Sequence, residues 1–203
     1  MDTLEDLWRA TNHTLRHFGC PERSLEEIRQ VVGNGARNQI RMSLPASGDH
    51  PPLEQVYAYY REYYNKTCSE GTAAPYPGIL EALQELRRTY PVAVVSNKPD
   101  PAVKQLCQIW FSGAFARGAS DDCPRKPAPD MVFKAMEAIG VDRCIYVGDS
   151  EVDVATARNA GVPCLSVLWG FRDKETLLQA GADCFCQEPA GLVSAIEQMI
   201  AQM

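Results

Sequence analysis

From residue 75 onward, short apolar runs alternate with amphipathic segments of helical length, and this alternation restricts the fold more than any other feature of the sequence. Runs such as VAVV at 92–95 and CIYV at 144–147 are apolar throughout, which is typical of strands buried on both faces. Strands that alternate with helices require a parallel sheet covered by helices on both faces. The predicted strands are residues 91–96, 115–119, 144–147, 163–168 and 182–186, and the predicted helices are residues 79–88, 101–111, 130–139, 152–160, 174–180 and 191–203.

The first part of the chain differs, because apolar residues recur there at helical spacing. Helices are predicted over residues 3–18, 24–32, 36–43 and 53–68. Residues 45–52 (PASGDHPP) have the composition of a loop, and Pro75–Gly78 marks the change of pattern. The sequence therefore predicts an all-α region at 1–74 and an α/β region at 75–203.

Composition narrows the classes of function. The formal net charge of −6 argues against nucleic-acid binding, which needs clustered Lys and Arg. Apolar runs are too short to span a bilayer and the first residues are amphipathic, so we expect a cytoplasmic protein with no membrane partner. The eight cysteines contain no CxxC pair, which argues against zinc binding or a disulfide framework. Cysteines within apolar strands are expected to act as small buried hydrophobic residues.

The first polar motif, Ser96-Asn97-Lys98-Pro99, closes a predicted strand. Ligands of open parallel sheets bind outside the carboxyl ends of the strands. There, Ser96 can offer a hydroxyl donor and Asn97 a backbone N–H to a phosphate oxygen. For this motif alone, a polar strand-to-helix turn is the favoured interpretation.

The second motif is Arg125-Lys126-Pro127-Ala128-Pro129-Asp130. A lysine between prolines, as Lys126 is, makes a suitable point charge for a phosphate. A solvated basic turn before a helix capped by Asp130 is an equally good interpretation of this motif alone.

The third motif, Gly148–Asp153 (GDSEVD), follows the most apolar strand. Asp149 and Asp153 at a strand end suit Mg²⁺, which prefers oxygen ligands and keeps several waters. The alternative is that Asp149 or Ser150 only caps the next helix, but a cap does not need the second acid, which favours the metal site.

Together and in this order, the motifs resemble those of haloacid-dehalogenase-like hydrolases. Ser96, Lys126 and the Asp149/Asp153 pair are similar to the second, third and fourth motifs of that superfamily. The stretches VGNGAR, PYPG, SNKP, RKPAPD, GDSEVD, LWGF and GADCFCQEP look like phosphoglycolate phosphatases. The resemblance implies a Rossmann-like α/β core at 75–203, whose first central strand is missing, and an all-α cap domain at 1–74.

The resemblance also implies an activity. Such proteins are Mg²⁺-dependent phosphoric monoester hydrolases that form an aspartyl-phosphate. It assigns catalytic roles to Lys126 and Ser96, phosphate binding to Ser96, Asn97 and Lys126, and Mg²⁺ binding to Asp149 and Asp153. The expected partner is a small phosphorylated metabolite, and the expected state is a monomer or homodimer.

The sequence departs from the family at its start. In the family a DxDGT motif supplies the nucleophile and the acid/base, whereas this sequence begins Met1-Asp2-Thr3 and matches only the tail of that motif. Asp2 is expected to cap the first helix instead. We therefore expect this chain to be inactive or severely impaired, either as an enzyme shortened by a misplaced start codon or in cloning, or as a non-catalytic relative that binds a phosphorylated ligand or a protein partner.

Substrate specificity is expected to reside in the cap. Arg37, in the GNGAR turn, is a candidate for binding a substrate carboxylate, because arginine binds carboxylates with two parallel hydrogen bonds. A surface arginine at the start of a helix is the alternative. Tyr57, Tyr60 and Tyr64 recur at helical spacing and are expected to pack within the cap.

Overall fold

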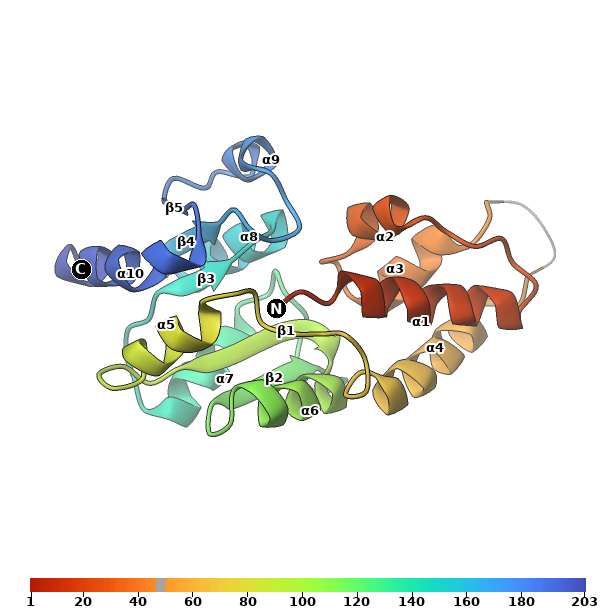
Figure 1. Cartoon of the computed structure of the whole chain (residues 1–203), viewed down its shortest axis with the longest axis horizontal. Helices are drawn as coiled ribbons and strands as arrows, with labels where there is room; N and C mark the ends of the chain where they lie inside the picture. Colours follow the sequence, from red (N-terminus) through yellow and green to blue (C-terminus); the bar gives the residue numbers. More distant parts are fainter. Residues whose placement is uncertain (47–49) are drawn as a thin grey trace.

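The structure is a computed structural model that describes residues 1–46 and 50–203 (Figure 1). Its helices and strands follow the predicted order. The predicted loop at 45–52 includes residues 47–49, which lie outside the described residues. Within the described residues, no helix is both long and apolar enough to cross a membrane.

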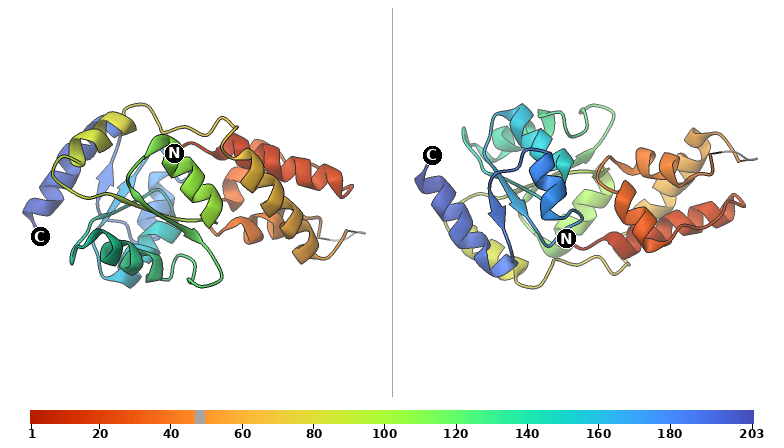
Figure 2. Two further views of the ribbon diagram at one scale, coloured as in Figure 1. Left: turned by 90° about the horizontal axis from the view of Figure 1, so that it is seen from below. Right: turned by 90° about the horizontal axis from the view of Figure 1, so that it is seen from above.

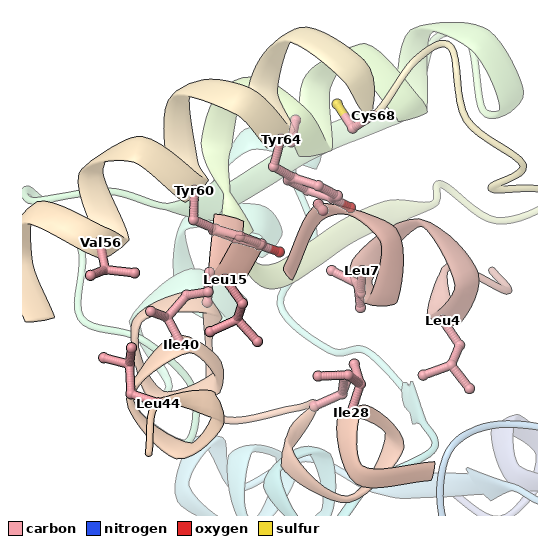
Figure 3. Packing of buried hydrophobic residues seen from close by; sticks show 14 of the residues in the cluster. Leu4, Leu7, Leu15, Ile28, Ile40, Leu44, Val56, Tyr60, Tyr64 and Cys68 are labelled. Atoms are coloured by element: carbon pink, nitrogen blue, oxygen red, sulfur yellow. The ribbon is translucent and has the colours of Figure 1, made fainter. Parts of the chain in front are cut away.

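Four helices form a separate group beside the α/β part of the chain (Figures 1 and 2). They are α1 (Leu4–His17), α2 (Leu25–Val31), α3 (Ala36–Ser43) and α4 (Leu53–Thr67). Their apolar faces share one buried cluster, which Figure 3 shows from close by. Tyr60 and Tyr64 belong to this cluster, so their predicted packing role is confirmed.

The rest of the chain alternates helices with parallel strands, as predicted. Its elements are α5 (Ile79–Leu86), β1 (Ala93–Pro99), α6 (Asp100–Trp110), β2 (Phe115–Ala119), α7 (Asp130–Ile139), β3 (Tyr146–Gly148), α8 (Glu151–Ala160), β4 (Cys164–Val167), α9 (Lys174–Gln179), β5 (Phe185–Cys186), the short 3₁₀ helix η1 (Pro189–Gly191) and α10 (Leu192–Ala201).

Helices cover both faces of the strands. Buried residues of α5 and α10 pack against one face of β4 and β5, and those two helices lie side by side (Figure 2). Buried residues of α8 and α9 pack on the other face. All eight cysteines are free, and each is buried or half-buried, in keeping with their expected role as small hydrophobic residues.

The strands form two parallel sheets, with the orders β1-β2 and β3-β4-β5. Within the described residues, no strand lies between β1 and β3, and neither strand has a partner on that side. A cavity of about 760 Å³ separates them, and its apolar walls include Val94 from β1 and Tyr146 from β3. The two strands thus remain apart instead of closing up to pair.

Strand β1 continues past its predicted end at Ser96. It pairs regularly with β2 as far as Val95, and its register then shifts before Pro99 pairs with Ala119. Residues 96–98 therefore leave the regular ladder. This irregularity lies at the carboxyl end of the strand and sets the first polar motif apart from the buried strand before it.

The start of the helical group is tied to the segment where the chain crosses into the α/β part. The backbones of Asp2 and Ala74 exchange two hydrogen bonds, of 2.8 and 3.2 Å. The buried carboxylate of Asp6 accepts bonds of 2.7 and 2.8 Å from the backbone N–H groups of Thr72 and Ala73. The side chain of Asp2 accepts a 3.3 Å bond from the N–H of Leu4, the first residue of α1. The N-cap position itself is Thr3, which makes no side-chain cap.

We expect Asp6→Ala to lower the free energy of unfolding by about 2–3 kcal/mol, because the buried N–H of Ala73 and the partly buried N–H of Thr72 would lose their acceptor. Urea titration followed by circular dichroism measures the loss. Asp142→Ala, at an exposed aspartate, is the control and should change stability by less than about 0.5 kcal/mol. Equal effects of the two substitutions would contradict this account of the crossing.

Candidate active site

The three polar motifs meet at one end of the cavity between the sheets. Ser96 and Asn97 follow the regular part of β1, Lys126 lies in the loop before α7, and Asp149 and Asp153 follow β3. All five residues line the same cavity. The motifs thus lie together, as expected of loops at the carboxyl ends of parallel strands, although they do so between two sheets.

Lys126 and Asp153 form a buried ion pair. The Lys126 Nζ lies 2.7 Å from Asp153 Oδ1, with side-chain exposures of only 11% and 8%. The Lys126 ammonium also donates to the hydroxyl of Tyr146 at 3.1 Å, and that hydroxyl donates to Asp153 Oδ1 at 3.0 Å. The role of Tyr146 was not predicted, because in the sequence it is one more apolar residue of a buried strand.

Asp153 also organises the loop after β3. Its Oδ2 accepts bonds from the Ser150 hydroxyl at 2.6 Å and from the Asp149 N–H at 3.2 Å. Burial alone would raise the pKa of Asp153, but Lys126 and Ser150 outweigh it and hold the pKa below its usual value. A Cβ at Gly148 would collide with the Asp153 side chain, so this packing needs glycine there.

The side chain of Asp149 makes fewer hydrogen bonds than that of Asp153. Its Oδ2 accepts one bond, of 2.9 Å, from the N–H of Phe171. Burial, together with the nearby charge of Asp153, raises the pKa of Asp149 above its usual value. A Cβ at Gly170 would overlap the Asp149 side chain, so the LWGF stretch holds this carboxylate by close backbone approach. Asp149 is therefore the carboxylate with binding capacity left for a ligand.

The two aspartates fit a Mg²⁺ ion. Among the described residues there is no group of three or more His, Cys, Asp or Glu that could hold a metal. Mg²⁺ does not need such a group, since it keeps several waters and binds through one or two carboxylates plus substrate phosphate. The half-buried carboxylate of Asp149, which accepts one hydrogen bond, suits direct coordination, whereas Asp153, already engaged by Lys126, suits contact through water.

Asn97 joins three segments through its side chain. Its Oδ1 accepts from the Lys126 N–H at 2.8 Å, and its Nδ2 donates to the carbonyls of Lys126 and Gly33 at 3.0 and 3.1 Å. The amide group is thus fully used, which leaves only the backbone N–H of Asn97 for a phosphate. Ser96 Oγ accepts a bond of 3.2 Å from the Lys98 N–H and keeps its own proton to donate.

A second contact between the helical group and the α/β part was not predicted. Arg172 pairs with Glu151 at 2.8 Å and donates to the carbonyls of Arg29 and Val32 at 3.1 and 2.8 Å. These carbonyls lie at the end of α2, far from Arg172 in sequence. No local pattern indicates such a pairing.

Arg37 is not brought to the cavity. It is exposed at the start of α3, and its guanidinium pairs with Glu54 at the start of α4. It is not among the residues that line the cavity. Its predicted role in binding a substrate carboxylate stays a prediction, which this placement does not support.

Comparison with known sequences agrees with the geometry. The sequence model of the haloacid dehalogenase-like hydrolases matches residues 1–167. The chain belongs to this family. This haloacid dehalogenase-like hydrolase is 35% identical over 179 residues to the phosphoglycolate phosphatase of Rhodobacter capsulatus, covering 85% of the chain and 81% of the relative. Phosphoglycolate phosphatase 1 of Pseudomonas aeruginosa is 32% identical over 182 residues, which are 84% of this chain and 66% of that protein.

Solved structures share the fold of this hydrolase. A crystal structure from Lactobacillus delbrueckii subsp. bulgaricus, described as a candidate phosphoglycolate phosphatase, has a TM-score of 0.86 and 32% identity, covering 96% of this chain and 92% of the other. CbbY from Rhodobacter sphaeroides, at 23% identity, has a TM-score of 0.78 over 97% of this chain and 93% of its own. The second similarity supports the fold alone.

The two aspartates should respond to mutation in opposite directions. Asp153→Asn should lower the free energy of unfolding by about 3–5 kcal/mol at neutral pH, because the buried Lys126 ammonium would lose its ion-pair partner. Asp149→Asn should raise the free energy of unfolding by about 0.5–2 kcal/mol, because it removes a half-buried charge that forms no ion pair within the described residues.

The pH dependence separates the two effects. A lowered pKa means that Asp153 stabilises the fold above about pH 4, and this contribution is lost as the pH falls through its folded pKa. A raised pKa means that ionised Asp149 destabilises the fold at neutral pH, and the gain from Asp149→Asn should vanish once the native carboxyl is protonated. Thermal unfolding of the two variants, measured with a chelator present from acid to neutral pH, tests both expectations. A loss of stability in Asp149→Asn at neutral pH would refute the raised pKa of Asp149.

Proposed function

We propose that this protein is a Mg²⁺-dependent phosphoric monoester hydrolase of the phosphoglycolate phosphatase type. The observation that carries the proposal is the convergence of Ser96, Lys126 and Asp149 on one end of one cavity. The phosphoglycolate phosphatases of similar sequence support the substrate class.

Two side chains supply the phosphate-binding donors. Lys126 has three ammonium protons, of which two go to Asp153 and Tyr146, so one remains for a phosphoryl oxygen. Ser96 donates its hydroxyl proton to a second oxygen, aided by the Asn97 backbone N–H. The ion pair keeps the Lys126 ammonium charged, since Asp153 and Tyr146 outweigh the effect of burial and raise its pKa.

Asp149 and Asp153 would hold the Mg²⁺ beside this cradle. When bound, the ion neutralises charge on the phosphoryl group during transfer. The residues of the chain itself orient the ester, since the donors of the cradle stand on fixed loops.

A nucleophilic carboxylate is the missing part of this set. Among the described residues, the carboxylates that line the cavity are Asp149 and Asp153, and both have other tasks in this proposal. We therefore propose that the 203-residue chain binds Mg²⁺ and phosphate esters but turns them over poorly. The same observation favours a second candidate function, a non-catalytic protein that binds a phosphorylated ligand or a protein partner.

The proposal also covers the domains of the protein, its partner, its location and its oligomeric state. We place a helical cap at 1–74 and a catalytic core at 75–203, with a small phosphorylated metabolite as the partner. We also propose a cytoplasmic location and a monomeric or homodimeric state.

Ligand binding is expected to stabilise the protein. Mg²⁺ with inorganic phosphate, at about a hundred times the dissociation constant, should add about 2.7 kcal/mol to the free energy of unfolding. Asp149→Asn should remove the Mg²⁺-dependent part, and Ser96→Ala should weaken the phosphate-dependent part. Thermal shift titrations measure both. Absence of any shift with either ligand in the unmodified chain would refute the proposed site.

Turnover is expected to need an added carboxylate. We expect a variant extended at its amino terminus by an apolar strand ending in Asp-x-Asp to hydrolyse 2-phosphoglycolate with Mg²⁺, at least about a thousandfold faster than the 203-residue chain. The same extension ending in Asn-x-Asn is the control. Equal rates for the unextended chain would place a nucleophile within it. Binding without turnover in all three proteins would instead favour the non-catalytic function.

A further inference from the structure

A second lysine faces the cavity without an acidic partner. Lys98 lines the cavity two residues after Ser96, and none of the ion pairs among the described residues involves it. Its Nζ lies 6.0 Å from the centre of the Tyr64 ring, so the ammonium extends from the α/β part toward helix α4. The neighbouring Lys126, by contrast, is already held by Asp153.

Two hydroxyl groups on the facing helix also lack partners. Tyr60 and Tyr64 of α4 are 0% and 1% exposed, and their rings stack with centres 5.7 Å apart. Neither hydroxyl has a partner of hydrogen-bonding geometry within the described residues, although the Gln39 side chain lies beside that of Tyr60. Both tyrosines line the cavity that contains Lys98. Figure 3 shows both hydroxyls pointing to the same side, away from α4. Buried donors without acceptors are costly, and native proteins seldom keep them without a ligand or water.

We propose that Lys98, with the hydroxyls of Tyr60 and Tyr64, forms a subsite for a carboxylate at the end of the substrate opposite the phosphoryl group. This inference rests on the proposed function and assigns the specificity of the same cavity. The subsite joins the two parts of the chain, since Lys98 belongs to the α/β part and the tyrosines belong to the helical group.

Charge favours a carboxylate over a second phosphoryl group. The subsite has one ammonium that forms no ion pair within the described residues, and it can balance at most a single negative charge. The nearby carboxylates of Asp149 and Asp6 add to the negative side, and both oppose the lowering of the Lys98 pKa to about 8 that burial causes. A doubly charged group would therefore lack compensation. A carboxylate gains one charged hydrogen bond, and its remaining acceptor positions suit phenolic donors.

With Lys98 in this place, the exposed Arg37 is not required for binding the substrate carboxylate. Arg37 is neutralised by Glu54 and lies outside the cavity. Lys98 is only two positions from the phosphate-binding Ser96, so a short substrate can reach both. Because Lys98 forms no ion pair within the described residues, its ammonium can bind the carboxylate of the ligand.

Calorimetric titration with two matched esters tests the proposal. The ligands are 2-phosphoglycolate and 2-hydroxyethyl phosphate, which differ in having a carboxylate or a neutral alcohol at the far end. Both are titrated with Mg²⁺ into the unmodified chain and into Lys98→Met. The substitution should raise the Kd of 2-phosphoglycolate about 10- to 100-fold and change that of the neutral ester by less than about twofold.

Two further variants sharpen the result. Tyr64→Phe should weaken 2-phosphoglycolate about 3- to 10-fold by removing one neutral donor, without effect on the neutral ester. Lys104→Met, the same substitution at an exposed lysine of α6 outside the cavity, is the matched control and should change neither Kd.

The outcomes distinguish a failure of the carboxylate subsite from a failure of the proposed phosphatase function. If the unmodified chain binds neither ester nor inorganic phosphate, the proposed function fails and the subsite falls with it. If it binds both esters but Lys98→Met leaves their ratio unchanged, the subsite is refuted and the phosphate site stands. Loss of the preference in Arg37→Ala, with Lys98→Met unaffected, would assign the carboxylate to the helical surface and overturn the inference.

Discussion

The buried pair of Lys126 and Asp153 holds the site together. Removing two charges from water is costly, and their attraction offsets that cost only when the geometry is good and the remaining hydrogen-bonding positions are filled. Here they are filled, because Tyr146, Ser150 and the Asp149 N–H all bond to the Asp153 carboxylate. The pair joins the loop before α7 to the loop after β3, and it leaves one proton of Lys126 to face the cavity.

The same polar network reaches the helical group. Asn97 holds both backbone groups of Lys126 and the carbonyl of Gly33, so the phosphate-binding loop and the turn before α3 share one side chain. Arg172 forms a second connection, to the end of α2. The groups inside this network are satisfied, whereas the half-buried Asp149 and Lys98 form no ion pair within the described residues. Stability thus resides in the paired residues, and binding capacity in the charges left over.

Much of this arrangement is predictable from the sequence, because period and position are local signals. The helices and strands lie close to their expected ranges. The position of the motifs at strand ends, with the family resemblance, indicated that Ser96, Lys126 and Asp149 would share a site. Other features depend on contacts between distant segments. Tyr146 has no polar signature within an apolar run, the contact of Arg172 with α2 joins segments far apart, and the pairing of Arg37 with Glu54 appears only once α3 and α4 are placed.

The separation of the sheets has a direct consequence for the chemistry. Ser96 belongs to the sheet of β1, and Asp149 to the sheet of β3, so the phosphate-binding and metal-binding halves stand on different sheets. No ladder of hydrogen bonds joins these sheets within the described residues; helix α7 packs against β1 and β2, and its Val132 meets Tyr146 in a shared apolar cluster. The Lys126–Asp153 pair is the polar counterpart of that contact. Phosphoryl transfer depends on positioning, and this helix and this ion pair are among the contacts that set the distance between Ser96 and Asp149. Whatever occupies the cavity between β1 and β3 therefore acts on both halves at once.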